Sequence, residues 1–282
     1  RGRAAARGPE DAGQALRERP DVTQTAPPEP PPETPEEEPG EKLLTLFEHL
    51  QELRRRVTIS ALTVVLGLAI TAYFGEDIID LLKEPAEKRV DNFQPQFIEP
   101  FELFVTYFRV ALLGGLIFAM PMIVYQTLGF VAPGLKPGER RWLYGTVVGA
   151  TALFLAGVAF AYFIALPPAL DFLLNFGNGD LAQPNIRIGS YIDFVTRLLF
   201  WTGVSFQTPI VVMFLARIGL VRAGQLVRWW RLAVVGAFVI AAIVTPTIDP
   251  VTQSLVAGPI IVLYFVGIVL ALFVQPKREP QE

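Results

Sequence analysis

The sequence contains no cysteine and only one histidine, His49. Without cysteine, the chain can form no disulfide, no thiolate nucleophile and no cysteine-ligated metal site. An isolated histidine is too little for a metal site or a catalytic base, and the sequence also lacks Walker loops, HExxH pairs and nucleophile elbows. We therefore expect no enzyme activity, no metal site and no cofactor.

Charge is missing from six long stretches of a chain that is 52% hydrophobic and has a mean hydropathy of +0.42. The stretches without Asp, Glu, Lys or Arg are 57–75, 110–135, 142–170, 198–216, 232–248 and 250–276. A membrane-spanning helix needs about 20 mainly apolar residues. The sequence therefore predicts an all-α membrane protein with six transmembrane helices, at approximately 57–75, 103–128, 142–166, 192–216, 232–246 and 251–273.

Large apolar residues are rare in the first 41 residues. This segment holds 9 of the 24 prolines and, with five arginines and ten acidic residues, a formal charge of −5. Such a segment buries too little apolar surface to offset the entropy of ordering. We expect a disordered acidic tail over 1–41, a membrane domain over 42–275 and a cytoplasmic tail over 276–282. The remainder of the chain has a charge of only +2, so no field for nucleic acid is expected.

The segment before the first predicted span, "EKLLTLFEHLQELRRR", has helical periodicity. One stripe is apolar and consists of Leu43, Leu46, Phe47, Leu50 and Leu53. A more polar face carries Glu48, Glu52 and either Arg55 or Arg56. We expect an amphipathic helix that lies in the membrane interface, and its periodicity alone indicates a simple anchor with solvated charges.

Basic residues near span ends predict which side of the membrane each loop faces. One side carries twelve: Arg54, Arg55, Arg56, Lys136, Arg140, Arg141, Arg217, Arg222, Arg228, Arg231, Lys277 and Arg278. The other carries six: Lys83, Lys88, Arg89, Arg109, Arg187 and Arg197. The richer side is expected to face the cytoplasm, and both termini are predicted to lie there.

The connections and span interiors give further local predictions. The first outer loop should form a helix broken at Pro85, and the fifth span has only about 14 residues before Pro246, too few for a bilayer core.

The span interiors are expected to hold no carboxylate or base. They hold uncharged polar residues instead, which suit hydrogen bonds between helices: Gln126, Ser205, Gln207, Thr245 and Gln253.

A carboxylate stands in a loop that prolines restrict. In "FVAPGLKPGERR", residues 130–141, Glu139 follows Pro133 and Pro137 and precedes two arginines. A carboxylate can meet the planar fork of a guanidinium group through two hydrogen bonds. From these residues alone, an exposed ion pair with Arg140 or Arg141 is the simpler explanation.

Five motifs in order resemble the TatC family. They are "HLQELRRR", "FVAPGLKPGERR", "AFAYFIALPPAL", "GVSFQTPIVV" and "GAFVIAAIVTPTIDPVTQSL", and the resemblance covers nearly all of residues 43–273. It implies a six-helix, glove-shaped receptor core of the twin-arginine protein translocase. Such a protein binds twin-arginine signal peptides, assembles with TatA- and TatB-type single-span subunits, and moves folded proteins with the proton-motive force.

The resemblance also implies roles for individual residues. Glu52 and Glu139 match the acidic positions that hold the two guanidinium groups of the signal peptide. Leu53, Arg54 and Phe130 belong to the same motifs and are assigned to the same binding site. Functional or partner-binding polar roles are implied for Gln207, Thr245, Asp249, Gln253 and Pro85. Gln207 replaces a glutamate of some members, so we expect it to form a hydrogen bond with a partner span rather than to carry a proton.

Two other functions remain open at this point. Six spans with broken helices and polar amides also fit a secondary transporter of a small solute, although the sequence contains no convincing repeat. A scaffold that only organises partner helices is the other alternative. For the favoured function we expect the plasma (cell inner) membrane, contact with the lipid bilayer and other copies of the chain.

Overall fold

A computed structural model gives the fold and describes residues 39–89, 93–131, 140–175, 186–217, 219–245 and 249–274. The predicted tails at 1–38 and 275–282 lie outside the described residues, as do Pro246 and the loop 132–139 that holds Glu139. The chain divides into two compact units, Arg1–Phe47 and Glu48–Glu282. All contacts described below lie within the second unit.

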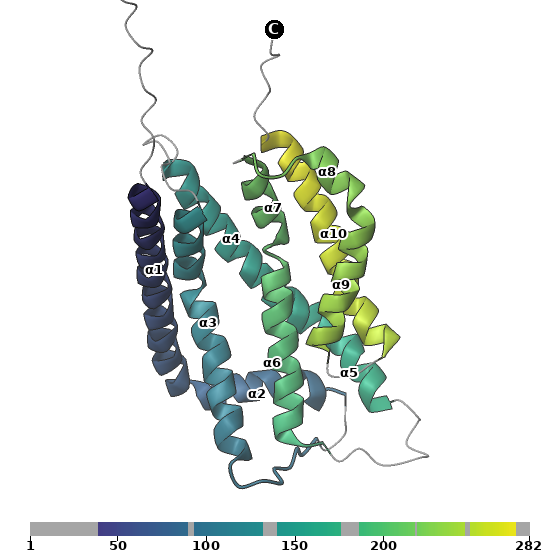
Figure 1. The fold of residues 1–282 in the computed structure, drawn as a ribbon. Helices are drawn as coiled ribbons and strands as arrows, with labels where there is room; N and C mark the ends of the chain where they lie inside the picture. Colours follow the sequence, from purple (N-terminus) through teal and green to yellow (C-terminus); the bar gives the residue numbers. More distant parts are fainter. Residues whose placement is uncertain are drawn as a thin grey trace, which may run out of the picture. The chain divides into compact units, whose positions relative to one another are not determined.

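The described residues are mostly helical (Figure 1). The helices are α1 (Pro39–Tyr73), α2 (Gly75–Glu87), α3 (Glu102–Val131), α4 (Arg140–Phe160), the π-helical η2 (Ala161–Ala165), α5 (Leu166–Asn175), α6 (Ile188–Ser205), α7 (Thr208–Arg217), α8 (Ala223–Arg228), α9 (Trp230–Val244) and α10 (Pro250–Val274). A single isolated bridge joins Gln96 to Arg187 within these ranges. The prediction of an all-α protein is confirmed.

Five helical segments are long and apolar enough to cross a membrane. They are Phe47–Tyr73, Glu102–Phe130, Tyr144–Leu173, Ile188–Arg217 and Pro250–Val274. The predicted fifth span corresponds to α9, which has 15 residues and rises only about 22 Å at helical geometry. The short length predicted for this span is therefore present in the structure, and the chain is a membrane protein with five long apolar segments and one short apolar helix.

The predicted interfacial helix is not a separate element. α1 runs without a break from Pro39 to Tyr73, so the polar segment around Glu52 belongs to the same helix as the first predicted span. No proline or glycine occurs between residues 41 and 66 to interrupt the helix. Residues 39–41, assigned to the tail from the sequence, are also helical.

The predicted break at Pro85 is wrong, because α2 continues through this residue to Glu87. A proline has no N–H to donate, so the carbonyl four residues earlier, that of Leu81, loses its helical partner. The Tyr162 hydroxyl donates to the Leu81 carbonyl at 2.8 Å instead. The next carbonyl, of Leu82, accepts a hydrogen bond of 2.7 Å from the Tyr191 hydroxyl. Two tyrosines from other helices thus stabilise the proline-containing turn.

α1 and α3 approach each other closely through small residues. A Cβ on Gly115 would lie 2.6 Å from the Leu68 backbone nitrogen, and a Cβ on Gly67 would lie 2.7 Å from the Gly115 carbonyl oxygen. At this crossing the Thr71 hydroxyl donates to the Ala111 carbonyl at 2.8 Å. Small residues and interhelical hydrogen bonds are what stabilise helix pairs in lipid, where the hydrophobic effect gives little between helices.

α6 is the central helix of the packed unit. Half of its apolar span is buried, against 6% of the α1 span. Its buried residues Ile192, Val195 and Leu198 belong to the main core, together with residues of α3, α5, α9 and α10. α6 therefore positions the elements that surround it, whereas most of α1 faces outward.

Two spans are interrupted at prolines. Pro167 and Pro168 follow η2. In a regular α-helix their rings would clash with the carbonyls four residues earlier, and the wider π turn makes room for them. The fourth span breaks between α6 and α7, at Phe206 and Gln207, which lie three and two residues before Pro209. At this break the Gln207 amide donates to the Ala150 carbonyl of α4 at 2.9 Å.

We predict that Gly115→Ala destabilises the protein by about 1–3 kcal/mol, because the new methyl group would overlap the α1 backbone. The matched control is Gly149→Ala on α4, where a Cβ has no atom within 4 Å. Thermal unfolding in detergent measures both. Equal stability of the two variants would contradict the close α1–α3 contact.

Candidate functional site

Two of the residues predicted to bind a signal peptide, Glu52 and Phe130, lie where α1 and α3 meet. Glu52 forms an ion pair with Arg56 one turn later, in which Nε and Nη2 of Arg56 donate to Oε1 of Glu52 at 2.9 and 2.5 Å. The Glu52 side chain is 38% exposed and that of Arg56 is 23% exposed. Leu53 and Arg54, on the same turn, are exposed. Glu139 lies outside the described residues.

Arg56 connects this turn of α1 to the end of α3. Its Nη1 donates to both the backbone carbonyl and the side-chain oxygen of Gln126, each at 3.4 Å. A Cβ on Gly129 would overlap Nη1, so a larger residue here would require the guanidinium group to shift. One turn before Glu52, His49 stacks on Phe130 with ring centroids 4.5 Å apart. The structure thus brings Glu52 and Phe130 to one junction of α1 and α3, which we call the α1–α3 junction.

The polar residues implied to face a partner lie elsewhere and are largely used within the chain. Thr245 is only 5% exposed, and its hydroxyl donates to the Ala241 carbonyl at 2.9 Å, so its hydrogen bond is made within the chain. The Gln207 amide donates to α4, as described above, and the expected hydrogen bond with a partner span stays a prediction. Both side chains turn inward because no water competes for their hydrogen bonds within a span.

Asp249 caps the start of α10, and Gln253 connects α10 to α9. Oδ1 of Asp249 accepts from the Thr252 backbone N–H at 2.6 Å, as expected of an N-cap. The Gln253 amide donates to the Phe238 carbonyl of α9 at 3.0 Å, and Gln253 stays half-exposed. Pro85 is buried in α2 and belongs to none of these groups. The implied residues therefore form no single cluster among the described parts of the chain.

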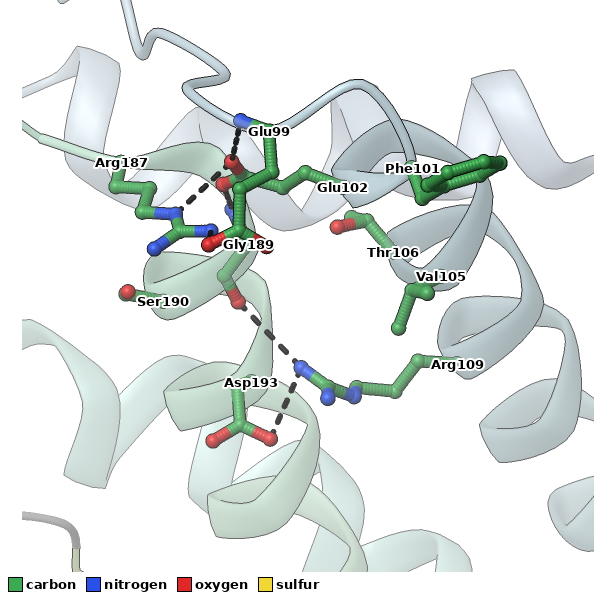
Figure 2. A pocket seen from close by; sticks show the side chains of 10 residues that line it. All are labelled: Glu99, Phe101, Glu102, Val105, Thr106, Arg109, Arg187, Gly189, Ser190 and Asp193. Carbon is green, nitrogen blue, oxygen red and sulfur yellow. Dashed lines mark hydrogen bonds and ion pairs between the residues drawn. The ribbon is translucent and has the colours of Figure 1, made fainter.

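The sequence analysis missed a buried carboxylate at the start of α3. The Glu102 side chain is 4% exposed, and both its carboxylate oxygens accept hydrogen bonds (Figure 2). Its Oε2 accepts from Nε of Arg187 and from the Ile98 N–H, both at 2.9 Å, and from the Glu99 N–H at 3.3 Å. Its Oε1 accepts from the Gly189 N–H at 2.8 Å. Glu102 therefore fastens the start of α6 to the start of α3.

Arg187 completes this cluster. It contacts Glu102 on its buried side and Glu99 on its exposed side, the latter from Nη2 at 2.9 Å. The hydrogen bonds to Glu102 and then to Glu99 raise the pKa of Arg187 above its ordinary value. Arg187 also forms the bridge to Gln96 that joins the loop before α3 to the loop before α6. The two loops and two helix starts are thus held together by one ion-pair network.

A second charged group lies deeper along the same helices, contrary to the expectation of uncharged span interiors. Asp193 Oδ1 accepts from Nη1 of Arg109 at 3.0 Å and from Nε of Arg197 at 2.9 Å. All three residues fall inside the apolar segments Glu102–Phe130 and Ile188–Arg217. The predicted spans 103–128 and 192–216 already contain these residues, but the uncharged stretches 110–135 and 198–216 begin just after Arg109 and Arg197, so the three charges were overlooked. Charges within spans are costly unless paired, and they commonly mark functional sites.

A pocket of about 290 Å³ lies between these two charged groups, at the starts of α3 and α6 (Figure 2). Glu99, Glu102 and Arg187 line one end, and Arg109 and Asp193 the other. Within the described ranges no group of three His, Cys, Asp or Glu side chains is placed to hold a metal ion. The pocket is therefore lined by carboxylates that are paired with arginines.

The family of the chain follows from comparison with known proteins. The family model of the Sec-independent protein translocase protein (TatC) matches residues 48–259. The chain belongs to this family. The match begins at the first residue of the second compact unit and includes the α1–α3 junction, α6 and the first part of α10. The resemblance drawn from the sequence motifs is confirmed.

Individual relatives agree with this assignment. The chain is 38% identical over 238 residues to TatC of Carboxydothermus hydrogenoformans, covering 84% of this chain and 97% of the relative. It is 40% identical over 227 residues to the chloroplastic TATC of Arabidopsis thaliana, covering 80% of this chain and 66% of the relative. The chain spans less than two thirds of the length of the Pisum sativum and Oryza sativa chloroplastic relatives, 64% and 62%.

Solved structures show that the fold is shared. A crystal structure of the twin-arginine translocase receptor TatC superposes with a TM-score of 0.73 at 36% identity, covering 80% of this chain and 99% of that chain. A second, determined in DDM, gives a TM-score of 0.74 at 38% identity, covering 79% and 99%. The helical arrangement described above is therefore that of the TatC family.

We predict that Glu102→Gln destabilises the protein by about 1–3 kcal/mol, because an amide group presents N–H donors to backbone N–H groups that need an acceptor. Glu99→Gln is the control, since this side chain is 69% exposed and an exposed pair contributes only about 0–1 kcal/mol. Chemical unfolding in mild detergent measures both variants. A loss for Glu99→Gln as large as that for Glu102→Gln would contradict the fastening role of Glu102.

Proposed function

We propose that this chain is the receptor subunit of a twin-arginine protein translocase and binds the paired arginines of signal peptides at the α1–α3 junction. In this proposal it assembles with TatA- and TatB-type single-span subunits and with other copies of itself. Folded proteins then cross the plasma (cell inner) membrane at the expense of the proton-motive force. The termini face the cytoplasm, six helices span the bilayer, and the chain performs no catalysis.

The observation that carries the proposal is the ion pair of Glu52 with Arg56. A guanidinium group of the chain itself already occupies the Glu52 carboxylate through two N–H donors. The site therefore accepts the planar fork of arginine, a geometry that lysine does not reproduce. Glu52 remains 38% exposed, so an incoming side chain can reach it.

A signal-peptide arginine can take the place of Arg56 at this carboxylate. Arg56 has a second set of acceptors, the backbone carbonyl and side-chain oxygen of Gln126, to which Nη1 already points. These acceptors lie near the C-terminal end of α3, where the helix dipole favours a cation. The exchange therefore leaves Arg56 solvated or bound to α3 rather than unpaired.

The second arginine of the signal peptide is assigned to Glu139. This residue follows α3 by eight positions and directly precedes α4, so the loop that holds it begins at the α1–α3 junction. Phe130, stacked on His49, supplies an aromatic surface at the same end of α3, and Leu53 and Arg54 are exposed on the adjoining turn of α1. Together they form the proposed binding surface.

Partner subunits are assigned to α9 and α10. The exposed large residues of α9 include Val235, Val239 and Ile243, which lie four residues apart and so form one outward stripe. Gln253 is half-exposed beside the Phe238 carbonyl that it contacts. The apolar span of a partner subunit that packs on this stripe would therefore meet one polar group, the Gln253 side chain, at the end of the stripe.

We predict that Glu52→Gln and Glu139→Gln each weaken binding of a twin-arginine peptide at least about tenfold, because each removes a charge-assisted hydrogen-bonded pair. Binding is measured by fluorescence anisotropy of a labelled peptide with the purified chain in nanodiscs. A twin-lysine peptide is the ligand control, and Glu48→Gln, an exposed carboxylate one turn before Glu52, is the protein control. Undiminished binding by the double variant would refute the site.

We also predict that Arg56→Gln strengthens binding of the same peptide by up to about fivefold. The substitution removes the resident competitor, whose partly exposed pair with Glu52 contributes about 0–1 kcal/mol. Arg55→Gln, one residue earlier on an exposed position, is the control. Weaker binding by Arg56→Gln would mean that Arg56 positions Glu52 instead of competing for it.

A further inference from the structure

The charged pocket between α3 and α6 continues into an apolar groove. A second cavity of about 320 Å³ shares Arg109 and Asp193 with the pocket in Figure 2. Thr196 and Arg197 also line it, and its remaining walls are apolar, with Leu112 and Leu116 from α3 and Phe200 and Trp201 from α6. The two cavities together form a recess that is charged at one end and apolar at the other, which we call the α3–α6 groove.

The charges at the junction of the two cavities do not cancel. Arg109 and Arg197 share one carboxylate, and both contact the same oxygen, Oδ1 of Asp193. The three residues therefore carry a net charge of +1, whereas Glu99, Glu102 and Arg187 at the other end of the charged pocket carry a net charge of −1. The side chains are 35% and 53% exposed for Arg109 and Arg197. Nη1 and Nη2 of Arg197 and Nε and Nη2 of Arg109 have no hydrogen-bond partner among the described residues.

The depth of these arginines defines what surrounds them. Arg109 lies seven residues after Glu102, roughly 10 Å along α3, and Arg197 lies nine residues after Ile188, roughly 14 Å along α6. A cation about two turns inside a span is stabilised by a partner from the interface or by extending toward it.

The chemistry of the groove indicates its occupant. Two arginines with unused N–H donors lie where the two cavities meet, and apolar side chains line the groove beyond them. A flexible acyl chain fits such an apolar groove, and an attached anion would accept hydrogen bonds from the two arginines.

We propose that the α3–α6 groove binds a phospholipid with a net anionic headgroup. The headgroup phosphate accepts hydrogen bonds from Arg109 and Arg197, and one acyl chain lies along Leu112, Leu116 and Trp201. The inference rests on the membrane location of the chain and does not require the proposed signal-peptide site, because the groove is built from the opposite end of α3.

Trp201 reports occupancy of the groove, since it lines the apolar cavity and is 38% exposed. The test uses the full chain with its other tryptophans replaced (Trp142→Phe, Trp229→Phe and Trp230→Phe) in phosphatidylcholine nanodiscs. Brominated phosphatidylglycerol or brominated phosphatidylcholine is added at increasing mole fraction, and quenching of Trp201 fluorescence is measured. We expect half-maximal quenching at an about 25-fold lower fraction of phosphatidylglycerol, from about fivefold for each arginine.

Three variants separate the parts of the site. Arg197→Gln keeps the Arg109–Asp193 pair and should reduce the preference to about fivefold, whereas the exposed Arg228→Gln on α8 should leave it unchanged. Leu112→Phe with Leu116→Phe narrows the apolar groove and should weaken quenching by both lipids without altering any charge. Equal quenching by the two lipids in the parent chain would overturn the proposal.

Two further outcomes would also overturn it. Inorganic phosphate at millimolar concentration should not displace the brominated lipid, and displacement would show a site for a free anion without an acyl chain. A preference that survives in the Arg109→Gln, Arg197→Gln double variant, folded as judged by circular dichroism, would place the anionic lipid elsewhere.

Discussion

Polar groups inside the apolar part of this protein must find partners within the chain, and much of the structure follows from that requirement. In lipid no water satisfies a backbone carbonyl released by a proline or a side chain placed in a span. The Leu81 carbonyl, freed by Pro85, accepts from Tyr162, and the Gln207 amide donates to Ala150 where the fourth span breaks. Each of these bonds joins helices that are distant in sequence, so the irregular turns also hold the bundle together.

The same requirement explains why charges occur in pairs and trios. Glu102 is almost fully buried and is matched by three backbone N–H groups and Arg187. Asp193 lies between two arginines in the early turns of the spans. The first group uses all its acceptors and fastens α3 to α6. The second leaves several donors unused, and this difference separates a structural cluster from a surface with capacity to bind.

The long helix α3 carries a different chemistry at each end. Its first turns hold Glu102 and Arg109, and its last turns hold Gln126 and Phe130 beside α1. Between them Gly115 permits the close α1 contact that fixes the position of α1. Arg109 of the proposed lipid site and Gln126 of the proposed signal-peptide site are thus separated by roughly 25 Å along one helix. A variant at one end can be tested without disturbing the other.

The sequence by itself determined the class of the protein. Long uncharged stretches dictate helices in a membrane, because only internally bonded backbone is stable there. Ordered motifs indicated the TatC family and Glu52 as a binding residue. The tertiary structure decided what each polar group contacts: that Glu52 is already paired with Arg56, that Thr245 is buried, and that Arg109 and Asp193 meet. Periodicity within a helix fixes the face on which a residue lies, whereas its partner depends on which helix packs against that face.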